Sequence, residues 1–182
     1  DRATGLGGWT DEDLGRALRE GIAPDGRYYY PVFPYPAYTG ISDADVAAIG
    51  AYLRSLKPVR QAVPQHDLPW YLSSRLVMLG WNLLNFRPGR FAPGESRSVE
   101  WNRGAYLVRH LGHCGECHTP RNLLGALDTS RELAGNPAWQ QKLPPLPGDK
   151  LTPGQPYAGI ALLVQRLLLL GVDLFVDLDD AA

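Results

Sequence analysis

Two cysteines and a histidine lie within five consecutive residues, Cys114-Gly115-Glu116-Cys117-His118. Thiols three positions apart can add across the two vinyl groups of a haem, and an imidazole directly after the second thiol can bind the iron. Cys-x-x-Cys-His is the attachment motif of c-type haem. We therefore predict that Cys114 and Cys117 hold one covalent haem c and that His118 is the proximal ligand of its iron.

The same cysteine pair has two other interpretations. Structural zinc usually takes four ligands, most often from two paired clusters. The chain has no second cysteine pair, and His66, His110 and His113 do not form a spaced His-x-x-x-His pair. A redox-active dithiol is expected next to a βαβ pattern, and the flanking residues show none. A zinc or dithiol binding module is therefore kept as an alternative to haem.

Composition and net charge argue against some classes of function and favour one kind of fold. The 182 residues carry a net charge of −1, so no basic field for nucleic acid is expected. Sixteen prolines and twenty glycines favour ordered loops between short helices over a large sheet. Haem c is attached on the outer side of energy-transducing membranes, so the motif predicts a periplasmic location. The chain begins with polar residues and no visible signal peptide, which predicts processing or a fragment.

The first 57 residues predict two helices around a loop. Thr10-Asp11-Glu12-Asp13 is typical of a capped helix start, and apolar residues follow at helical spacing. Residues 28–40 hold three prolines among aromatic side chains, which predicts an extended loop and no helix. Ser42 begins a second capped helix, and Pro58 ends it.

Three further segments are expected to be helical. An apolar stripe with four-three spacing follows a proline-rich stretch, and it is formed by Leu72, Leu76, Leu79, Leu83 and Phe86. We expect part of this stripe to contact a partner protein, with simple core packing as the alternative. A helix over about 98–111 leads into the haem motif. Residues 157–178 are interrupted by Gln165, Arg166 and Asp173, so we expect a packed helix there, with peripheral membrane contact as the alternative.

Several stretches make a family recognisable. A helix that leads directly into Cys-x-x-Cys-His resembles the N-terminal helix of class I cytochromes c, and residues 42–57 resemble their C-terminal helix. The chain resembles more closely the multihaem cytochrome c subunits of membrane-associated alcohol, aldehyde and gluconate dehydrogenases. It is carried by Gly7-Gly8-Trp9-Thr10-Asp11-Glu12, Pro24-Asp25-Gly26-Arg27, Tyr35-Pro36-Ala37-Tyr38, Asn102-Arg103-Gly104-Ala105-Tyr106-Leu107-Val108 and His113-Cys114-Gly115-Glu116-Cys117-His118-Thr119-Pro120-Arg121-Asn122.

The resemblance implies an all-α fold with three parts. Residues 1–57 would be the C-terminal part of a first cytochrome c-like domain without its own haem motif, either degenerate or truncated. Residues 58–97 would be a linker with an apolar helix. Residues 98–182 would form a haem-bearing cytochrome c-like domain with an atypical C-terminus.

The resemblance also implies a function and partners. Such a chain would not be an enzyme itself. It would take electrons from a catalytic dehydrogenase subunit and pass them toward membrane quinone, a membrane-bound subunit or an oxidase. Its expected location is the periplasm, with association to the membrane as a further option.

The sequence departs from the family at the distal iron ligand, which is normally a methionine after the haem motif. Met78 is the only methionine, and it precedes the motif. No methionine, histidine or cysteine follows His118. In the first half, Phe33 stands where the family has methionine. A haem protein with an open distal site that binds small ligands or reduces peroxide is therefore an alternative function.

Overall fold

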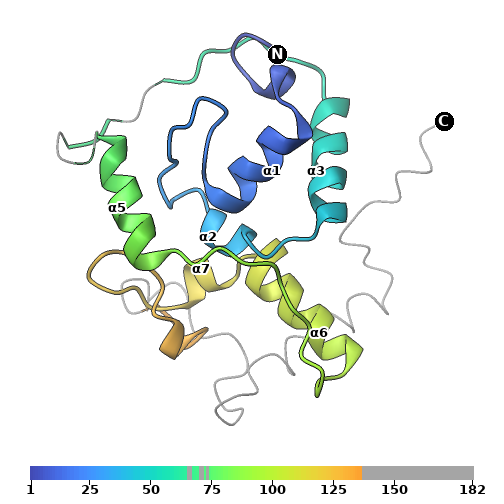
Figure 1. The fold of residues 1–182 in the computed structure, drawn as a ribbon, viewed down its shortest axis with the longest axis vertical. Helices are drawn as coiled ribbons and strands as arrows, with labels where there is room; N and C mark the ends of the chain where they lie inside the picture. The colour runs from blue at the N-terminus through green and yellow to red at the C-terminus, as the bar shows by residue number, and fades with distance from the viewer. Residues whose placement is uncertain (65–66, 70–71, 73, 137–182) are drawn as a thin grey trace. The chain divides into compact units, whose positions relative to one another are not determined.

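A computed structural model describes residues 1–64, 67–69, 72 and 74–136. Among these residues there is no β-strand, and pairing is limited to the isolated bridges Ile22–Tyr28 and Arg121–Leu127. The predicted all-α class is confirmed for this part of the chain (Figure 1). The elements in chain order are η1 (Leu6–Gly8), α1 (Asp11–Glu20), α2 (Tyr35–Tyr38), α3 (Asp43–Ser55), α5 (Arg75–Asn85), α6 (Val99–Tyr106), η2 (Leu107–Leu111), α7 (Gly115–His118) and η3 (Thr129–Arg131).

The chain divides into two compact units, Asp1–Phe91 and Ala92–Ala182. The division falls within residues 58–97, so α5 and residues 86–91 belong to the first unit. The helix expected over 157–178 lies outside the described residues. None of the described helices is long and apolar enough to span a bilayer.

The first helix of unit 1 begins and ends as the sequence predicts. The Thr10 hydroxyl accepts a hydrogen bond from the backbone of Asp13, and the Thr10 backbone donates to the Asp13 carboxylate at 3.0 Å. The bonds that the Thr10 backbone and the Thr10 hydroxyl donate to the Asp13 carboxylate lower the pKa of Asp13. The helix ends at Gly21, which has φ +66°. A Cβ there would lie 2.5 Å from the ring of Tyr35, so this position requires glycine for both conformation and space.

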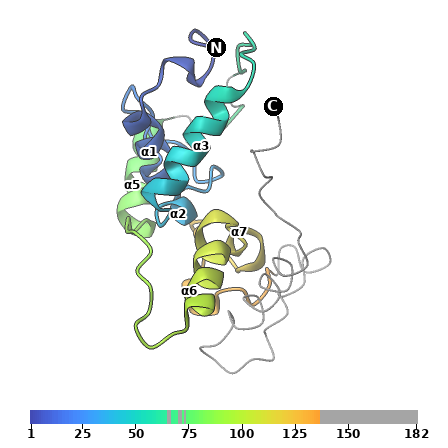
Figure 2. The ribbon, with the colours of Figure 1, turned by 90° about the vertical axis from the view of Figure 1, so that its right-hand side faces the viewer.

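Helices α1 and α3 pack side by side in both views (Figure 1, Figure 2). The Ser42 hydroxyl caps α3 by accepting from the backbone of Asp45, as predicted. Gly50 allows a close approach, because a Cβ added there would lie 3.0 Å from the side chain of Leu14. Small residues at this crossing therefore set how near the two helices come.

The aromatic loop contains a short helix that the sequence analysis excluded. Residues Tyr35–Tyr38 form the turn α2, with Pro34 before it and Pro36 near its start. The prediction of a loop without helix is wrong here, because the first residues of a helix need no backbone donor and therefore tolerate proline.

Tyr35 is the centre of the core of unit 1. Its side chain is fully buried, and its ring meets Phe86 edge-to-face at 5.2 Å between centroids. The phenol donates a hydrogen bond of 2.5 Å to the Oδ1 atom of buried Asn82 on α5. The phenol of Tyr30 also donates to the Leu72 carbonyl. The loop and α5 are thereby held together, and burial raises the pKa of Tyr35 to about 12.

We predict that Tyr35→Phe destabilises the fold by about 1–3 kcal/mol, because it leaves the Asn82 oxygen buried without its donor. The substitution should also change the alkaline behaviour. An unfolded tyrosine has a pKa near 10, so between pH 10 and about 12 the folded state keeps a proton that the unfolded chain releases. Stability from this group is complete below pH 10 and is lost as the pH rises through that window.

Urea unfolding between pH 8 and 12 measures both effects. The wild-type chain should lose stability more steeply above pH 10 than Tyr35→Phe. Tyr52→Phe is a matched control, because the Tyr52 side chain is 55% exposed. Equal slopes for the wild type and Tyr35→Phe would contradict the prediction.

Helix α5 does not bury the leucine stripe as one face. Met78 and Asn82 are buried, at 5% and 8% exposure, and they define the inner side of the helix. Leu76 and Leu83 of the stripe are 75% and 69% exposed. The alternative that the whole stripe is core is therefore wrong for these two residues; the inner side instead carries Asn82, which accepts a hydrogen bond from the phenol of Tyr35.

Unit 2 begins with a capped helix that becomes irregular before the haem motif. The Ser98 hydroxyl accepts from the backbone of Trp101 and starts α6. The predicted helix over 98–111 is confirmed, but its last five residues form the π-helical turn η2. After α7 the chain folds back over residues 119–136, with η3 within this segment.

Candidate haem-attachment site

Cys114, Cys117 and His118 are brought together by the single helical turn α7. The backbone of His118 donates to the Cys114 carbonyl at 3.1 Å, which closes the turn. Residues at positions i, i+3 and i+4 of a helix share one face. Both thiols and the imidazole are therefore placed on the same side of α7.

The segment after the motif anchors this turn. The Thr119 hydroxyl is buried and accepts from the backbone of Leu133 at 2.9 Å. The backbone of Gly135 donates to the His118 carbonyl at 2.8 Å. His118 is thereby fixed through its own backbone and through the next residue. Sequence reasoning missed Thr119 because its partner lies fourteen residues further along.

The Arg121 side chain holds Glu116, one of the two residues between the thiols, through hydrogen bonds. Its guanidinium donates to the Glu116 carboxylate at 2.7 Å, to the Glu116 carbonyl at 3.1 Å and to the Gly125 carbonyl at 2.7 Å. The Glu116 side chain is only 12% exposed, so it lies against the protein. These charge-assisted bonds hold Glu116 in place within the motif.

Both thiols are free for chemistry. Neither forms a disulfide; Cys114 is half-buried and Cys117 is exposed. Burial raises the pKa of Cys114. The set therefore offers two uncommitted thiols and one imidazole on a short, anchored turn, which fits the demands of covalent haem.

The other residues considered as iron ligands belong to unit 1 or precede this turn within unit 2. Met78 is buried in unit 1. Phe33, also in unit 1, packs edge-to-face with two tyrosine rings at 5.6 and 5.9 Å. His110 lies in η2, and its ring centroid is 5.9 Å from that of Tyr106 in α6. His113 directly precedes Cys114. His66 lies outside the described residues.

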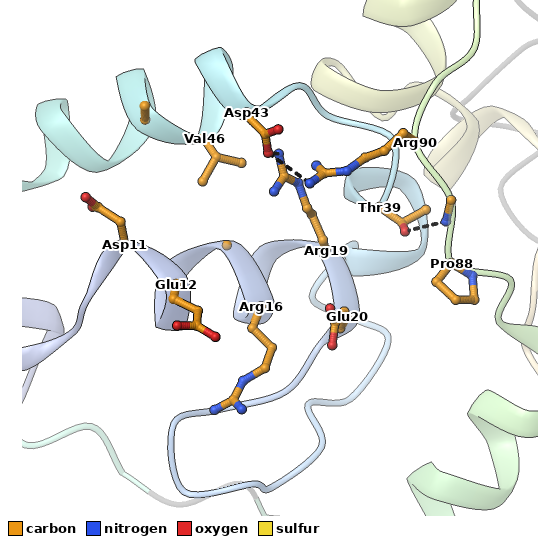
Figure 3. A pocket seen from close by; sticks show the side chains of 13 residues that line it. Asp11, Glu12, Arg16, Arg19, Glu20, Thr39, Asp43, Val46, Pro88 and Arg90 are labelled. Carbon is orange, nitrogen blue, oxygen red and sulfur yellow. Dashed lines mark hydrogen bonds and ion pairs between the residues drawn. The ribbon is translucent and has the colours of Figure 1, made fainter.

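Unit 1 has a surface hollow of about 620 Å³ that is lined by residues of this unit alone (Figure 3). Arg19 and Arg90 converge there on Asp43, at 2.7 and 2.9 Å, and both also donate to the Ile41 carbonyl. The Thr39 hydroxyl accepts from the backbone of Gly89. These contacts tie the segment after α5 to the α2–α3 corner, so we interpret the hollow as structural.

For the zinc alternative, the described part of the chain contains no group of three or more histidine, cysteine or acidic side chains that could hold a metal ion. A zinc centre would therefore need ligands from elsewhere. An α-helical chain with free thiols and an imidazole on one turn has the features of a c-type cytochrome.

Comparison with known proteins agrees with this class. The diheme cytochrome c-type protein of Cereibacter sphaeroides is 48% identical over 133 residues, which cover 73% of this chain and 45% of the relative. The fructose dehydrogenase cytochrome subunit of Gluconobacter japonicus is 42% identical over 133 residues, covering 72% and 27%. A subunit of the nicotinate dehydrogenase of Pseudomonas putida is 49% identical over 126 residues, covering 69% and 11%. No family model matches the chain.

Over the matched residues the chain is similar to relatives named as cytochrome c subunits of dehydrogenases, which is the resemblance that the sequence motifs predict. It spans less than half the length of each relative described above.

Proposed function

We propose that this chain carries one covalent haem c and transfers electrons as a subunit of a dehydrogenase complex. The observation that carries the proposal is the placement of two free thiols and an imidazole on one face of α7. The chain contains two cysteines, so 182 residues accommodate one such attachment. The names of the relatives, which include gluconate and alcohol dehydrogenase cytochrome c subunits, support the same role.

Each residue of the site has a part in this proposal. Cys114 and Cys117 would hold the haem through thioether bonds, and His118 would bind its iron. Thr119 and Arg121 hold the turn in place through Leu133 and Glu116. When bound, haem supplies one-electron oxidation and reduction. The chain would thus relay electrons from a catalytic subunit toward membrane quinone or an oxidase, on the periplasmic side of the membrane.

A pyridine haemochrome spectrum of the denatured, acid-acetone-extracted chain tests the attachment. Covalent haem stays with the polypeptide and gives a c-type spectrum. A redox titration of the folded chain then tests the transfer function, with one reversible one-electron step expected. A chain that keeps no haem after extraction would contradict the proposal and would favour the zinc or dithiol alternative.

The partner is proposed to be the catalytic dehydrogenase subunit, and the exposed side of α5 is the proposed contact. Leu76, Val77, Leu83 and Leu84 are exposed on this helix, and a Cβ added at Gly80 between them would meet nothing within 4 Å. Apolar side chains clustered on one surface favour a protein interface. The relatives named as dehydrogenase subunits support a dehydrogenase subunit as the occupant of this surface.

We predict that Leu83→Glu weakens binding of the dehydrogenase subunit, because a carboxylate on the apolar contact loses its solvation when the interface forms. Val63→Glu, at an 80% exposed position outside α5, is the matched control. Co-purification with the dehydrogenase subunit measures binding, and the melting temperature of the isolated chain measures stability. A lowered melting temperature with unchanged binding would show that α5 contributes only to the fold.

A further inference from the structure

The turn between α6 and the haem motif has an unusual hydrogen-bond pattern. The backbone of Gly112 donates to the Leu107 carbonyl at 2.6 Å, five residues back, and the backbone of Cys114 donates to the Val108 carbonyl at 3.0 Å, six residues back. Single π-helical turns within helices are uncommon and are frequent at functional sites. Here the turn directs the chain straight into the first thiol.

Gly112 is required in this turn for space. A Cβ at this position would lie 2.9 Å from the Leu107 carbonyl oxygen and 3.4 Å from the Cys114 sulfur. The φ angle of −83° is ordinary for any residue, so backbone conformation does not explain the glycine. The nearest obstructing atom belongs to the backbone of the same turn and cannot rotate away. A larger residue would therefore have to displace the turn that carries Cys114.

The turn also requires residue 113 to adopt a left-handed backbone conformation. The φ angle of His113 is +38°, in the region that glycine adopts freely and that residues with a Cβ adopt at a cost. This reversal brings the backbone of Cys114 onto the Val108 carbonyl. Two consecutive residues therefore fix the first thiol, one by its small size and one by its conformation.

Gly115, directly after Cys114, differs from Gly112 in the space around it. A Cβ at Gly115 would make only ordinary contacts, at 3.4 Å to the Thr119 hydroxyl and 3.9 Å to Leu127. The chain thus offers two glycines within four residues, one closed to a methyl group and one open to it.

We propose that Gly112 and His113 are positioning residues for haem attachment, and that they hold the Cys114 thiol where it and Cys117 can reach the two vinyl groups together. The inference rests on the proposed function. Each thiol adds across a vinyl double bond, so that sulfur bonds one carbon, hydrogen passes to the other, and nothing is released. The step needs placement alone, and displacement of one thiol should leave one vinyl group unreacted.

The test compares Gly112→Ala with Gly115→Ala in the full chain. After denaturation, free thiols on the haem-bearing chains are alkylated and located by peptide mass mapping, and the haemochrome band reports any remaining vinyl group. We expect Gly115→Ala to keep both thioethers. Gly112→Ala should show a several-fold loss of chains with two thioethers, with alkylation at Cys114 and a band shifted to longer wavelength. Two thioethers at the wild-type proportion in Gly112→Ala would overturn the inference.

A second pair covers the case in which Gly112→Ala does not accumulate. His113→Gly accepts the left-handed conformation, whereas His113→Val resists it. Both remove the imidazole, so a difference between them reports the backbone alone. We expect His113→Gly to keep the Cys114 thioether and His113→Val to lose it; equal behaviour would overturn the inference. A wild-type chain without covalent haem would instead refute the proposed function itself.

Discussion

Replacing Cys114 and Cys117 together with serine is expected to abolish covalent haem. The two thiols lie on one face of α7 and both are free, so they are the only groups in the chain that can form thioethers. Each single replacement should leave one thioether, and haem should then survive extraction in smaller yield. Acid-acetone extraction followed by the haemochrome spectrum measures the loss.

Glu116→Gln is the matched control for this experiment. Glu116 lies between the two cysteines, and glutamine keeps the size of its side chain. The amide oxygen can still accept from the Arg121 guanidinium, and the bond from that guanidinium to the backbone carbonyl of residue 116 does not depend on the carboxylate. Both thioethers should persist in this variant. If the double serine variant still carried haem through denaturation and extraction, Cys-x-x-Cys-His would not be the attachment site.

The helix starts of unit 1 could be predicted because their determinants are local. Thr10 and Ser42 each accept from a backbone donor three residues away, and both partners are readable from neighbouring positions. The haem motif is equally local, since five residues contain every group that it needs. Interactions between residues this close in the sequence can be recognised without any knowledge of the fold.

The inner side of α5 could not be predicted in the same way. Leucine spacing pointed to Leu76 and Leu83, whereas the buried side carries Met78 and Asn82. The choice depends on Tyr35, which lies 47 residues before Asn82 and needs an acceptor for its phenol. Periodicity records which residues are apolar. It does not record that a polar residue is preferred because of a distant hydroxyl.

The turn before the haem motif was missed for a related reason. A glycine followed by a histidine is common in helices and loops alike, and nothing in their order indicates a π-helical turn. Only the carbonyl of Leu107 and the sulfur of Cys114, brought within 2.9 and 3.4 Å of the missing methyl group, show that Gly112 has no room for one. Space of this kind is a property of the fold.

The last expected result concerns the distal side of the iron. Met78→Leu should leave the spectrum of the haem-bearing chain unchanged, because the side chain is buried on α5 in unit 1 and the substitution conserves volume. His118→Ala should instead alter the spectrum while the thioethers persist, as expected for loss of the proximal ligand. A methionine–iron charge-transfer band in the ferric wild type, lost in Met78→Leu, would refute the assignment.

The same spectra separate electron transfer from the alternative of an open distal site. No methionine, histidine or cysteine follows His118 in this chain, so the usual distal ligands are lacking after the motif. If the distal position is open, the reduced chain should bind carbon monoxide rapidly and the oxidised chain should react with peroxide. If a group from elsewhere in the chain or from the partner subunit fills it, carbon monoxide binding should be slow and should be limited by the release of that group. Measuring the carbon monoxide rate with and without the dehydrogenase subunit would therefore show whether complex formation closes the site and thereby favours electron transfer over ligand chemistry.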